Sequence, residues 1–138
     1  MHVFTYGSLM FPAIWQRVVR GAYRSEPAVL HDHARFALID DTYPGVVPDV
    51  AATVEGVLYR DVDMADIVAL DAFEGSEYRR ETVTVTLASG ARAMAQTYVF
   101  LATHRLSVHS WEPQAFRMSR FIDTYCAKNR RTSRRLTG

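Results

Sequence analysis

The sequence predicts an α+β fold: a small, mixed, mainly antiparallel sheet that curls into a barrel-like shape, with a few flanking helices. Three observations predict it. Several segments alternate apolar and polar residues with the period of a strand, only three segments have helical spacing, and a Ser89-Gly90 turn joins two of the longer strands. Long strands joined by a tight hairpin favour antiparallel pairing with few helices.

Residues that begin and end helices support the order of elements. Pro12 opens the first helix and Gly21 follows it, while Asp63 precedes the second helix and Gly75 follows it. In the second strand apolar residues recur at every other position, and Asp32 occupies one of these positions. The predicted elements are strands 2–5, 27–39, 53–59, 78–87 and 91–101, helices 12–19, 63–73 and 113–128, and a turn at 40–45.

Helix 63–73 is expected to bury the side that carries Met64, Ile67 and Val68, because these residues recur at helical spacing. Asp66 lies in its first turn, where the helix dipole favours an acid. In strand 78–87, threonines alternate with apolar residues, which is typical of a half-buried strand.

The 138 residues suffice for one domain with its own core, and no repeat or linker divides them. We expect a single domain over residues 1–127 and a flexible basic tail over 128–138. Five of the 16 Lys and Arg residues lie in this tail, which leaves 11 cations against 15 acids and a net charge of about −4 for residues 1–127. Binding of nucleic acid or an anionic surface through the tail is the alternative.

A cytoplasmic location is predicted from the N-terminus, the apolar runs and the single cysteine. The first residues lack the basic and apolar regions of a signal peptide, and no apolar run reaches the length of a membrane helix. Cys126 cannot form an internal disulfide and is expected to be a buried thiol. His31 and His33 share a strand face and could form a two-ligand metal pair, but no third ligand is evident, so no metal or cofactor is expected.

The segment Tyr6-Gly7-Ser8-Leu9 ends the first strand and leads to the first helix. Such an ending exposes several backbone N–H groups in a row, and Gly7 lets a ligand approach the backbone. These N–H groups and the Ser8 hydroxyl can hold a carboxylate or a carbonyl oxygen. The loop lacks the Gly-Lys-Ser/Thr of a Walker motif and the three glycines of a dinucleotide fingerprint. A plain strand-to-helix turn is the alternative interpretation.

Glu74 lies at the C-terminal end of the second helix. The negative end of the helix dipole and partial burial near Phe73 and Tyr78 both disfavour a carboxylate there. Both effects raise the expected pKa of Glu74 towards the working pH, which suits a general acid–base group. A solvated glutamate at a helix end is the alternative, and Glu77 is a second acid close by.

Other polar residues were weighed as ligands. Alternation along strand 78–87 lets one of Arg79 and Arg80 pair with a substrate carboxylate and turns the other outward. His104 and His109 flank Arg105 in a predicted loop, where they could bind anions or remain solvated.

Three motifs together resemble the gamma-glutamylcyclotransferase-like superfamily, and most closely its avirulence-induced-gene-like branch, which includes gamma-glutamylamine cyclotransferases. The resemblance covers roughly residues 3–125. The motifs, in chain order, are Tyr6-Gly7-Ser8-Leu9, Tyr43-Pro44-Gly45, and Leu70-Asp71-Ala72-Phe73-Glu74-Gly75 followed by Tyr78-Arg79-Arg80.

The resemblance implies a small mixed α/β barrel and an enzyme that cyclises a gamma-glutamyl amine or peptide to 5-oxoproline and releases the amine, without a metal or cofactor. It implies that Glu74, in the Glu-Gly pair, is the catalytic residue. The substrate-binding residues implied by it are Tyr6, Gly7, Ser8, Leu9, Tyr43, Pro44 and Tyr78. The partner is therefore a small-molecule gamma-glutamyl substrate.

Three alternatives stay open. The chain could be a non-catalytic small-molecule-binding domain of the same fold, or an enzyme that removes a gamma-glutamyl group in natural-product metabolism. A nucleic-acid binder acting through residues 128–138 is the third, and the net acidic charge of the remaining chain argues against it.

Overall fold

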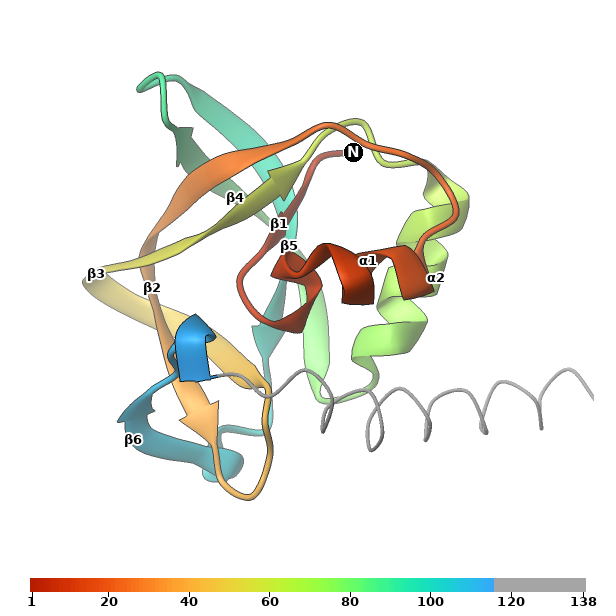
Figure 1. Cartoon of the computed structure of the whole chain (residues 1–138). Helices are drawn as coiled ribbons and strands as arrows, with labels where there is room; N and C mark the ends of the chain where they lie inside the picture. Colours follow the sequence, from red (N-terminus) through yellow and green to blue (C-terminus); the bar gives the residue numbers. More distant parts are fainter. Residues whose placement is uncertain (116–138) are drawn as a thin grey trace, which may run out of the picture.

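The structure, a computed structural model, describes residues 1–115. Five strands close a barrel in the order β3-β1-β5-β4-β2, because β2 pairs with β3 as well as with β4 (Figure 1). The strands are β1 (Val3–Thr5), β2 (Ser25–Leu38), β3 (Pro44–Tyr59), β4 (Tyr78–Leu87), β5 (Arg92–Phe100) and β6 (Leu106–Ser110). The helices are α1 (Pro12–Val18) and α2 (Met64–Glu74), with short 3-10 turns η1 (Ser8–Met10), η2 (Thr103–Arg105) and η3 (Pro113–Ala115).

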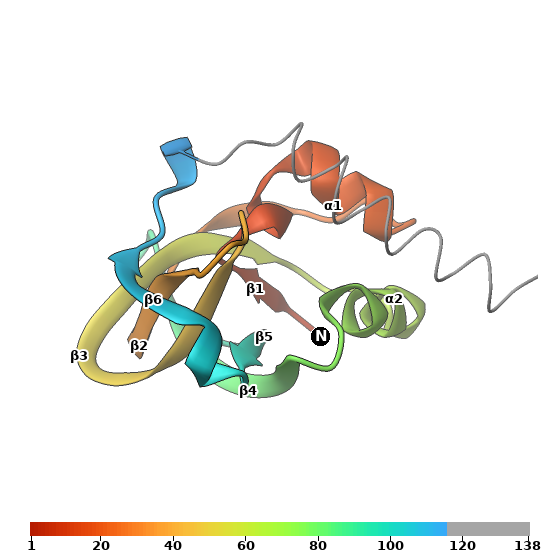
Figure 2. The same ribbon diagram turned by 90° about the horizontal axis from the view of Figure 1, so that it is seen from below.

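Within residues 1–115 the sheet is mixed and mainly antiparallel, since β1 and β5 are the only strands there that pair in parallel. The sixth strand, β6, pairs with the end of β2 and lies outside the closed barrel. Figures 1 and 2 show both helices on one side of the barrel. The predicted α+β barrel-like fold is therefore confirmed.

Two apolar cores follow from the alternation of side chains along the strands. Phe4 and Leu58 point into the barrel, where residues of the strands and Tyr6, which follows β1, form one cluster. Their neighbours Val3 and Tyr59 belong to a second cluster that the helices cover. The ring of Trp15 on α1 stacks on that of Tyr59 with centroids 3.7 Å apart and planes 6° apart, which fixes α1 against the barrel.

The β2–β3 hairpin is longer than the sequence predicts. β3 starts at Pro44, so the predicted turn at 40–45 ends too late. The predicted strand 53–59 starts too late for the same reason. Residues 49–52 of β3 bulge opposite Asp32, whose φ is 58° and whose carboxylate accepts the Ala51 N–H at 3.2 Å. The bulged segment is exposed, with Val50 86% accessible, so it lacks the alternation that marks a half-buried strand.

The strand β6 was not predicted, and the predicted loop at His104 and His109 is wrong for His109, which lies in β6. Three of its five residues are exposed because it forms an edge of the sheet, so apolar periodicity is weak there. The predicted helix 113–128 is described only at Pro113–Ala115, as a 3-10 turn. The rest of that helix, Cys126 and the basic tail 128–138 lie outside the described residues.

The predicted buried side of α2 is wrong for Met64 and Val68, which are 57% and 62% exposed. The buried residues are Asp66, Ile67 and Leu70. The helix turns this side inward because the Asp66 carboxylate accepts hydrogen bonds from the chain between α1 and β2. Its partners are the N–H groups of Arg20 (2.9 Å) and Gly21 (3.0 Å) and the hydroxyl of Tyr23.

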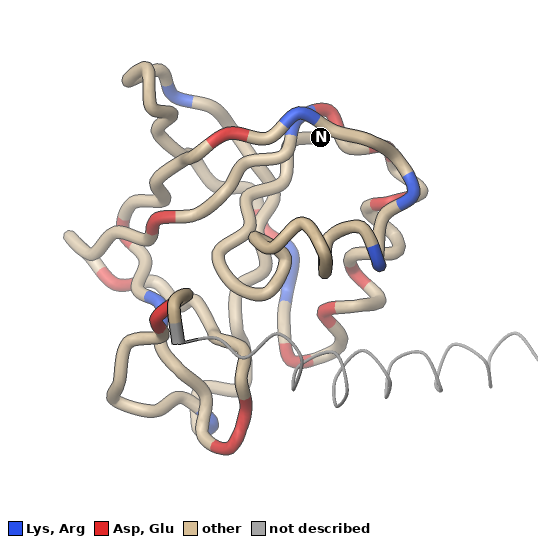
Figure 3. The backbone as a smooth tube through the Cα atoms, in the orientation of Figure 1, with Lys and Arg blue, Asp and Glu red and all other residues tan. Residues whose placement is uncertain are grey.

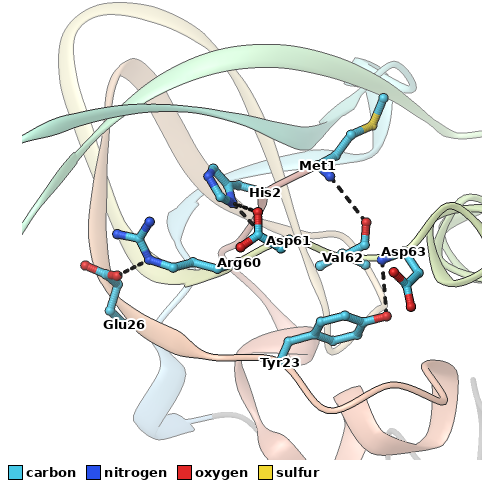
Figure 4. Close-up of polar contacts among 8 residues, drawn as sticks. All are labelled: Met1, His2, Tyr23, Glu26, Arg60, Asp61, Val62 and Asp63. Carbon is cyan, nitrogen blue, oxygen red and sulfur yellow. Dashed lines mark hydrogen bonds and ion pairs between the residues drawn. The ribbon is translucent and has the colours of Figure 1, made fainter.

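The start of α2 is tied to the N-terminus of the chain (Figure 4). Asp63 is the N-cap residue, as predicted, although its side chain makes no capping hydrogen bond. Its N–H donates to the Tyr23 hydroxyl at 3.2 Å, and the Met1 ammonium donates to the Val62 carbonyl at 3.3 Å. Nearby, Arg60 and Glu26 form an ion pair at 2.6 Å. These contacts hold the first strand and α2 in a fixed relation.

We expect Asp66→Asn to lower the free energy of unfolding by about 2 kcal/mol at pH 7, since hydrogen bonds to a charged acceptor are lost. Hydrogen bonds from Tyr23 and then Arg20 lower the pKa of Asp66 below its ordinary value of 3.8. The stabilisation by this group is therefore present above pH 3.8 and is lost as the pH falls through the lower folded-state pKa. Urea unfolding of both proteins at pH 7 and pH 3 tests this, and an equal difference at the two pH values would contradict it.

Candidate active site

A cavity opens where the end of β1, the start of β3 and the end of α2 meet. Every residue that the resemblance assigned to the site lines it, so the structure brings the three motifs together. Four further lining residues were not predicted. The lining consists of Phe4, Thr5, Tyr6, Gly7, Ser8, Leu9, Tyr43, Pro44, Phe73, Glu74, Tyr78 and Tyr98.

The loop from Tyr6 to Leu9 is held by the fold on both sides. The Met10 N–H donates to the Gly7 carbonyl at 3.0 Å, which closes the 3-10 turn η1. The Tyr6 hydroxyl donates to the Tyr98 carbonyl of β5 and accepts a hydrogen bond from the Val46 N–H of β3. Burial and the nearby Glu74 raise the pKa of Tyr6, so its hydroxyl stays protonated. The protonated hydroxyl can therefore keep its hydrogen bond to β5.

The loop touches the Tyr43-Pro44 segment at Gly7. A methyl group added at Gly7 would lie 2.8 Å from the Pro44 Cδ atom, well inside contact distance. Glycine is therefore required at this position by the close approach of the second motif. The two segments form adjacent walls of the cavity.

Glu74 is the last residue of α2, and Gly75 turns the chain away from the helix. Gly75 has φ 81° and ψ −170°, a conformation open almost only to glycine. Its N–H donates to the Asp71 carbonyl at 3.1 Å. The Glu-Gly pair thus has a backbone reason: glycine ends the helix so that the glutamate side chain faces the cavity.

We expect Gly75→Ala to lower the free energy of unfolding by about 1–3 kcal/mol, because alanine is strained in this conformation. No atom lies within 4 Å of the added methyl group, so strain and not collision is the cause. Gly75→Asn should lose a similar amount, since the tolerance of asparagine for positive φ belongs to the left-handed α region and not to ψ −170°. Chemical denaturation measures both variants, and a Gly75→Ala protein as stable as wild type would contradict the backbone argument.

Burial of the Glu74 carboxyl group, and then the negative charge of Asp71, raise its pKa from 4.5 to about 8. Asp71 lies one helical turn earlier on the same side of α2. Figure 3 shows that the charged residues of α2 are all acidic, and the negative helix end adds to the same effect. Glu74 therefore carries its proton near neutral pH and can release it at modest cost, as a general acid–base group must.

Asp71 and Tyr98 form a network that sequence analysis missed. The Asp71 carboxylate accepts from the Tyr98 hydroxyl at 2.7 Å and from the Arg80 guanidinium at 3.0 Å. Arg80 also donates to the Gln96 side chain at 2.9 Å. The i,i+3 spacing of Asp71 and Glu74 on a predicted helix could have indicated that the two acids are neighbours. Nothing in the sequence distinguishes Tyr98 from the apolar residues of its strand.

Two tyrosine hydroxyls at the cavity donate their protons in hydrogen bonds to other protein groups. Tyr98 donates to Asp71, and Tyr78 donates to the Pro44 carbonyl at 2.7 Å. A hydroxyl that donates its only proton to the protein can still accept a hydrogen bond through its oxygen. The Tyr98 oxygen can therefore accept a hydrogen bond from an amine.

The other sequence candidates do not line the cavity. Glu77 pairs with Arg105, which also pairs with Asp41. Arg79 is exposed and pairs with Glu81 at 3.3 Å. Of the two acids considered from the sequence, Glu74 lines the cavity with the loop and Glu77 does not.

The two histidines considered as metal ligands also have protein partners. His31 contacts the Thr86 hydroxyl at 3.0 Å, and the His33 ring contacts the His31 carbonyl at 2.8 Å. Across residues 1–115 no group of three His, Cys, Asp or Glu side chains is arranged to hold a metal ion. None of the helices in that range is long and apolar enough to span a bilayer.

The Glu74 carboxyl group lies at a cavity beside the strand-to-helix loop of a small mixed barrel. The sequence model of the family described as gamma-glutamyl cyclotransferase, AIG2-like, matches residues 3–114. The chain belongs to this family. The resemblance drawn from the three motifs is thereby confirmed.

Plant proteins are among its relatives. Protein AIG2 C of Arabidopsis thaliana is 28% identical over 129 residues, which span 90% of this chain and 78% of the relative. AIG2-like protein D of the same plant is 33% identical over 103 residues, covering 72% of this chain and 68% of the relative.

Solved structures share the fold. A solution structure of an Arabidopsis thaliana protein has a TM-score of 0.69 at 26% identity and covers 99% of this chain and 81% of its own. A structure named gamma-glutamyl cyclotransferase has a TM-score of 0.64 at 18% identity, covering 72% of this chain and 65% of that protein. The second likeness concerns the fold alone.

Proposed function

We propose that this protein is an enzyme that cyclises a gamma-glutamyl amine or peptide to 5-oxoproline and releases the amine, with Glu74 as the general acid–base residue. The observation that carries the proposal is the enclosed Glu74 carboxyl group in the cavity lined by Tyr6 to Leu9. Membership of the gamma-glutamyl cyclotransferase, AIG2-like, family supports the choice of reaction.

The reaction needs no protein nucleophile. The α-amine of the substrate attacks its own γ-carbonyl carbon, which forms the lactam C–N bond, and the amide C–N bond to the leaving amine then breaks. The cavity holds the substrate in a folded conformation, so that the two reacting atoms are close and the attack is intramolecular.

Glu74 moves one proton in two steps. Its carboxylate accepts a proton from the attacking amine, and its carboxyl group then donates a proton to the leaving nitrogen. A pKa of about 8 suits both steps, because neither form of the group is strongly disfavoured near neutral pH. The Tyr98 oxygen can accept a hydrogen bond from the amine before the attack.

The γ-carbonyl oxygen becomes negative during the attack and requires hydrogen-bond donors. The backbone N–H groups of the loop from Gly7 to Leu9 and the Ser8 hydroxyl line the same cavity and can supply them. Because the fold holds this loop at both ends, the donors need little reorganisation when the charge develops.

The test is to incubate the protein with γ-glutamyl methylamide and a γ-glutamyl dipeptide in water enriched in oxygen-18. Cyclisation gives 5-oxoproline without the heavy isotope, together with the free amine. Hydrolysis gives glutamate that carries one heavy oxygen, which would contradict the proposed reaction type. Tight binding of either compound without turnover would instead identify a non-catalytic binding domain.

A further inference from the structure

Arg35 of β2 reaches the backbone of the candidate active site from outside the cavity. Its guanidinium donates to the Tyr6 carbonyl at 2.7 Å and to the Glu55 carbonyl at 3.1 Å. Burial lowers the pKa of Arg35, although Glu112 and Glu55 oppose the shift. Arg35 lines a separate hollow with Glu55 and Glu112, so the loop that starts at Tyr6 lies between the guanidinium and the cavity.

Trp111 reaches the second wall of the same cavity. Its indole Nε1–H donates to the Thr42 carbonyl at 2.9 Å, directly before Tyr43 and Pro44. The guanidinium carbon of Arg35 lies 5.2 Å from the centre of the Trp111 ring, within the range of a cation–π contact. Only 6% of Trp111 is exposed, so these contacts are shielded from water.

The strand β6 explains how Trp111 comes to this place. The barrel closes through the β2–β3 pairing and does not need β6. β6 pairs with β2 at Ser110 and Phe36, the residues next to Trp111 and Arg35. The added strand therefore delivers the indole ring to the guanidinium.

We propose that Arg35 and Trp111 form a clamp that sets the spacing and orientation of the two loops of the active site, and that both act as positioning residues. In a planar trans peptide the C=O and the N–H point in opposite directions. Holding the Tyr6 carbonyl on the Arg35 side therefore turns the Gly7 N–H to the cavity side. Holding the Thr42 carbonyl places Pro44 against Gly7.

The kinetic part of this inference rests on the proposed cyclisation. Arg35→Met keeps most of the unbranched stem of the side chain but removes its donors. We expect its kcat to fall about 100-fold, as for misplaced oxyanion donors, while KM changes less than about threefold. Arg35→Lys restores one donor and should recover activity to within about tenfold of wild type. Trp111→Phe keeps an aromatic ring, removes the indole N–H and should lower kcat about tenfold.

Arg60→Met is the matched control, because it removes another partly buried guanidinium, which pairs with Glu26 (Figure 4). Arg60 does not line the cavity. All rates are measured well below the melting temperature of each variant. A control that loses as much activity as Arg35→Met would overturn the clamp, as would wild-type turnover in Arg35→Met when Glu74→Gln is inactive.

Hydrogen exchange followed by NMR tests the clamp without any turnover. The amides of Met10 and Phe11 report on the first loop, since they donate to its carbonyls. The clamp predicts that Trp111→Phe speeds their exchange about tenfold, although the indole N–H of Trp111 donates to the second loop. It also predicts faster exchange of the indole Nε1–H in Arg35→Met. Effects confined to each variant's own loop would overturn the clamp, whether or not the protein makes 5-oxoproline.

Discussion

The Glu74→Gln protein is expected to lose about 10²–10⁴-fold of the wild-type kcat/KM for a γ-glutamyl amine. Glutamine keeps the size of the side chain and fits the enclosed position but can neither accept nor donate the proton that the reaction moves. The fold should remain intact, since glutamine is neutral and has nearly the shape of the protonated carboxyl group that it replaces. Steady-state release of 5-oxoproline measures the loss.

Glu77→Gln is the matched control for this prediction. It removes a carboxylate only three residues further along the chain, but Glu77 pairs with Arg105 and does not line the cavity. Its activity per folded molecule should stay within about threefold of wild type, which corresponds to less than about 1 kcal/mol. Activity retained in Glu74→Gln, or an equal loss in both proteins, would mean that Glu74 is not the acid–base residue.

The same Glu74→Gln substitution should stabilise the fold in alkaline solution. The folded-state pKa of Glu74 is raised from 4.5 to about 8, so the folded protein binds this proton more tightly than the unfolded chain. The stabilisation by this proton is fully present below pH 4.5 and is lost as the pH rises towards about 8. Glutamine is neutral throughout, so the variant should gain about 2–4 kcal/mol over wild type between pH 5 and pH 9.

Denaturant unfolding at pH 5, 7 and 9 measures this gain. Glu81→Gln serves as the comparison, because Glu81 forms an exposed ion pair with Arg79 and its loss should cost less than about 1 kcal/mol. A stability difference between Glu74→Gln and wild type that stays constant from pH 5 to pH 9 would contradict an enclosed, proton-binding carboxyl group.

Together these two results would mean that the protein is less stable at working pH because of the group that makes it active. Burying a titratable carboxyl group beside Asp71 costs folding free energy above neutral pH. Natural proteins accept such costs at active sites, where function requires a group in an unfavourable environment. A purely structural glutamate at a helix end would have no reason to be enclosed.

The sequence predicted the fold class and pointed to residues that line the cavity, whereas some bounds of the surrounding strands were wrong. Gly7 and Gly75 each carry a backbone requirement that only glycine meets, and such residues leave a local pattern that can be read without a structure. Glu74 follows from the same pattern, because it precedes the glycine that ends α2. That Gly7 and Glu74 line one cavity depends on the tertiary fold. Only the resemblance to the family led us to expect it.

The missed residues act through contacts between distant parts of the chain. Tyr98 and Asp71 are 27 positions apart, and Arg35 meets Trp111 across β2 and β6. No local periodicity encodes such pairs. β6 was missed because its edge position leaves it mostly exposed, and the buried side of α2 was misassigned because Asp66, a polar residue, occupies it.

The Glu74 carboxyl group is expected to lie at the cavity and to remain protonated at neutral pH. A carbon-13 NMR titration of the side-chain carboxyl groups of wild type and Glu74→Gln measures this directly. One glutamate carboxyl should titrate with a pKa of about 8 in the wild type, and its resonance should be absent from the variant. A wild-type spectrum in which every glutamate carboxyl titrates below about pH 5, as in model peptides, would contradict it.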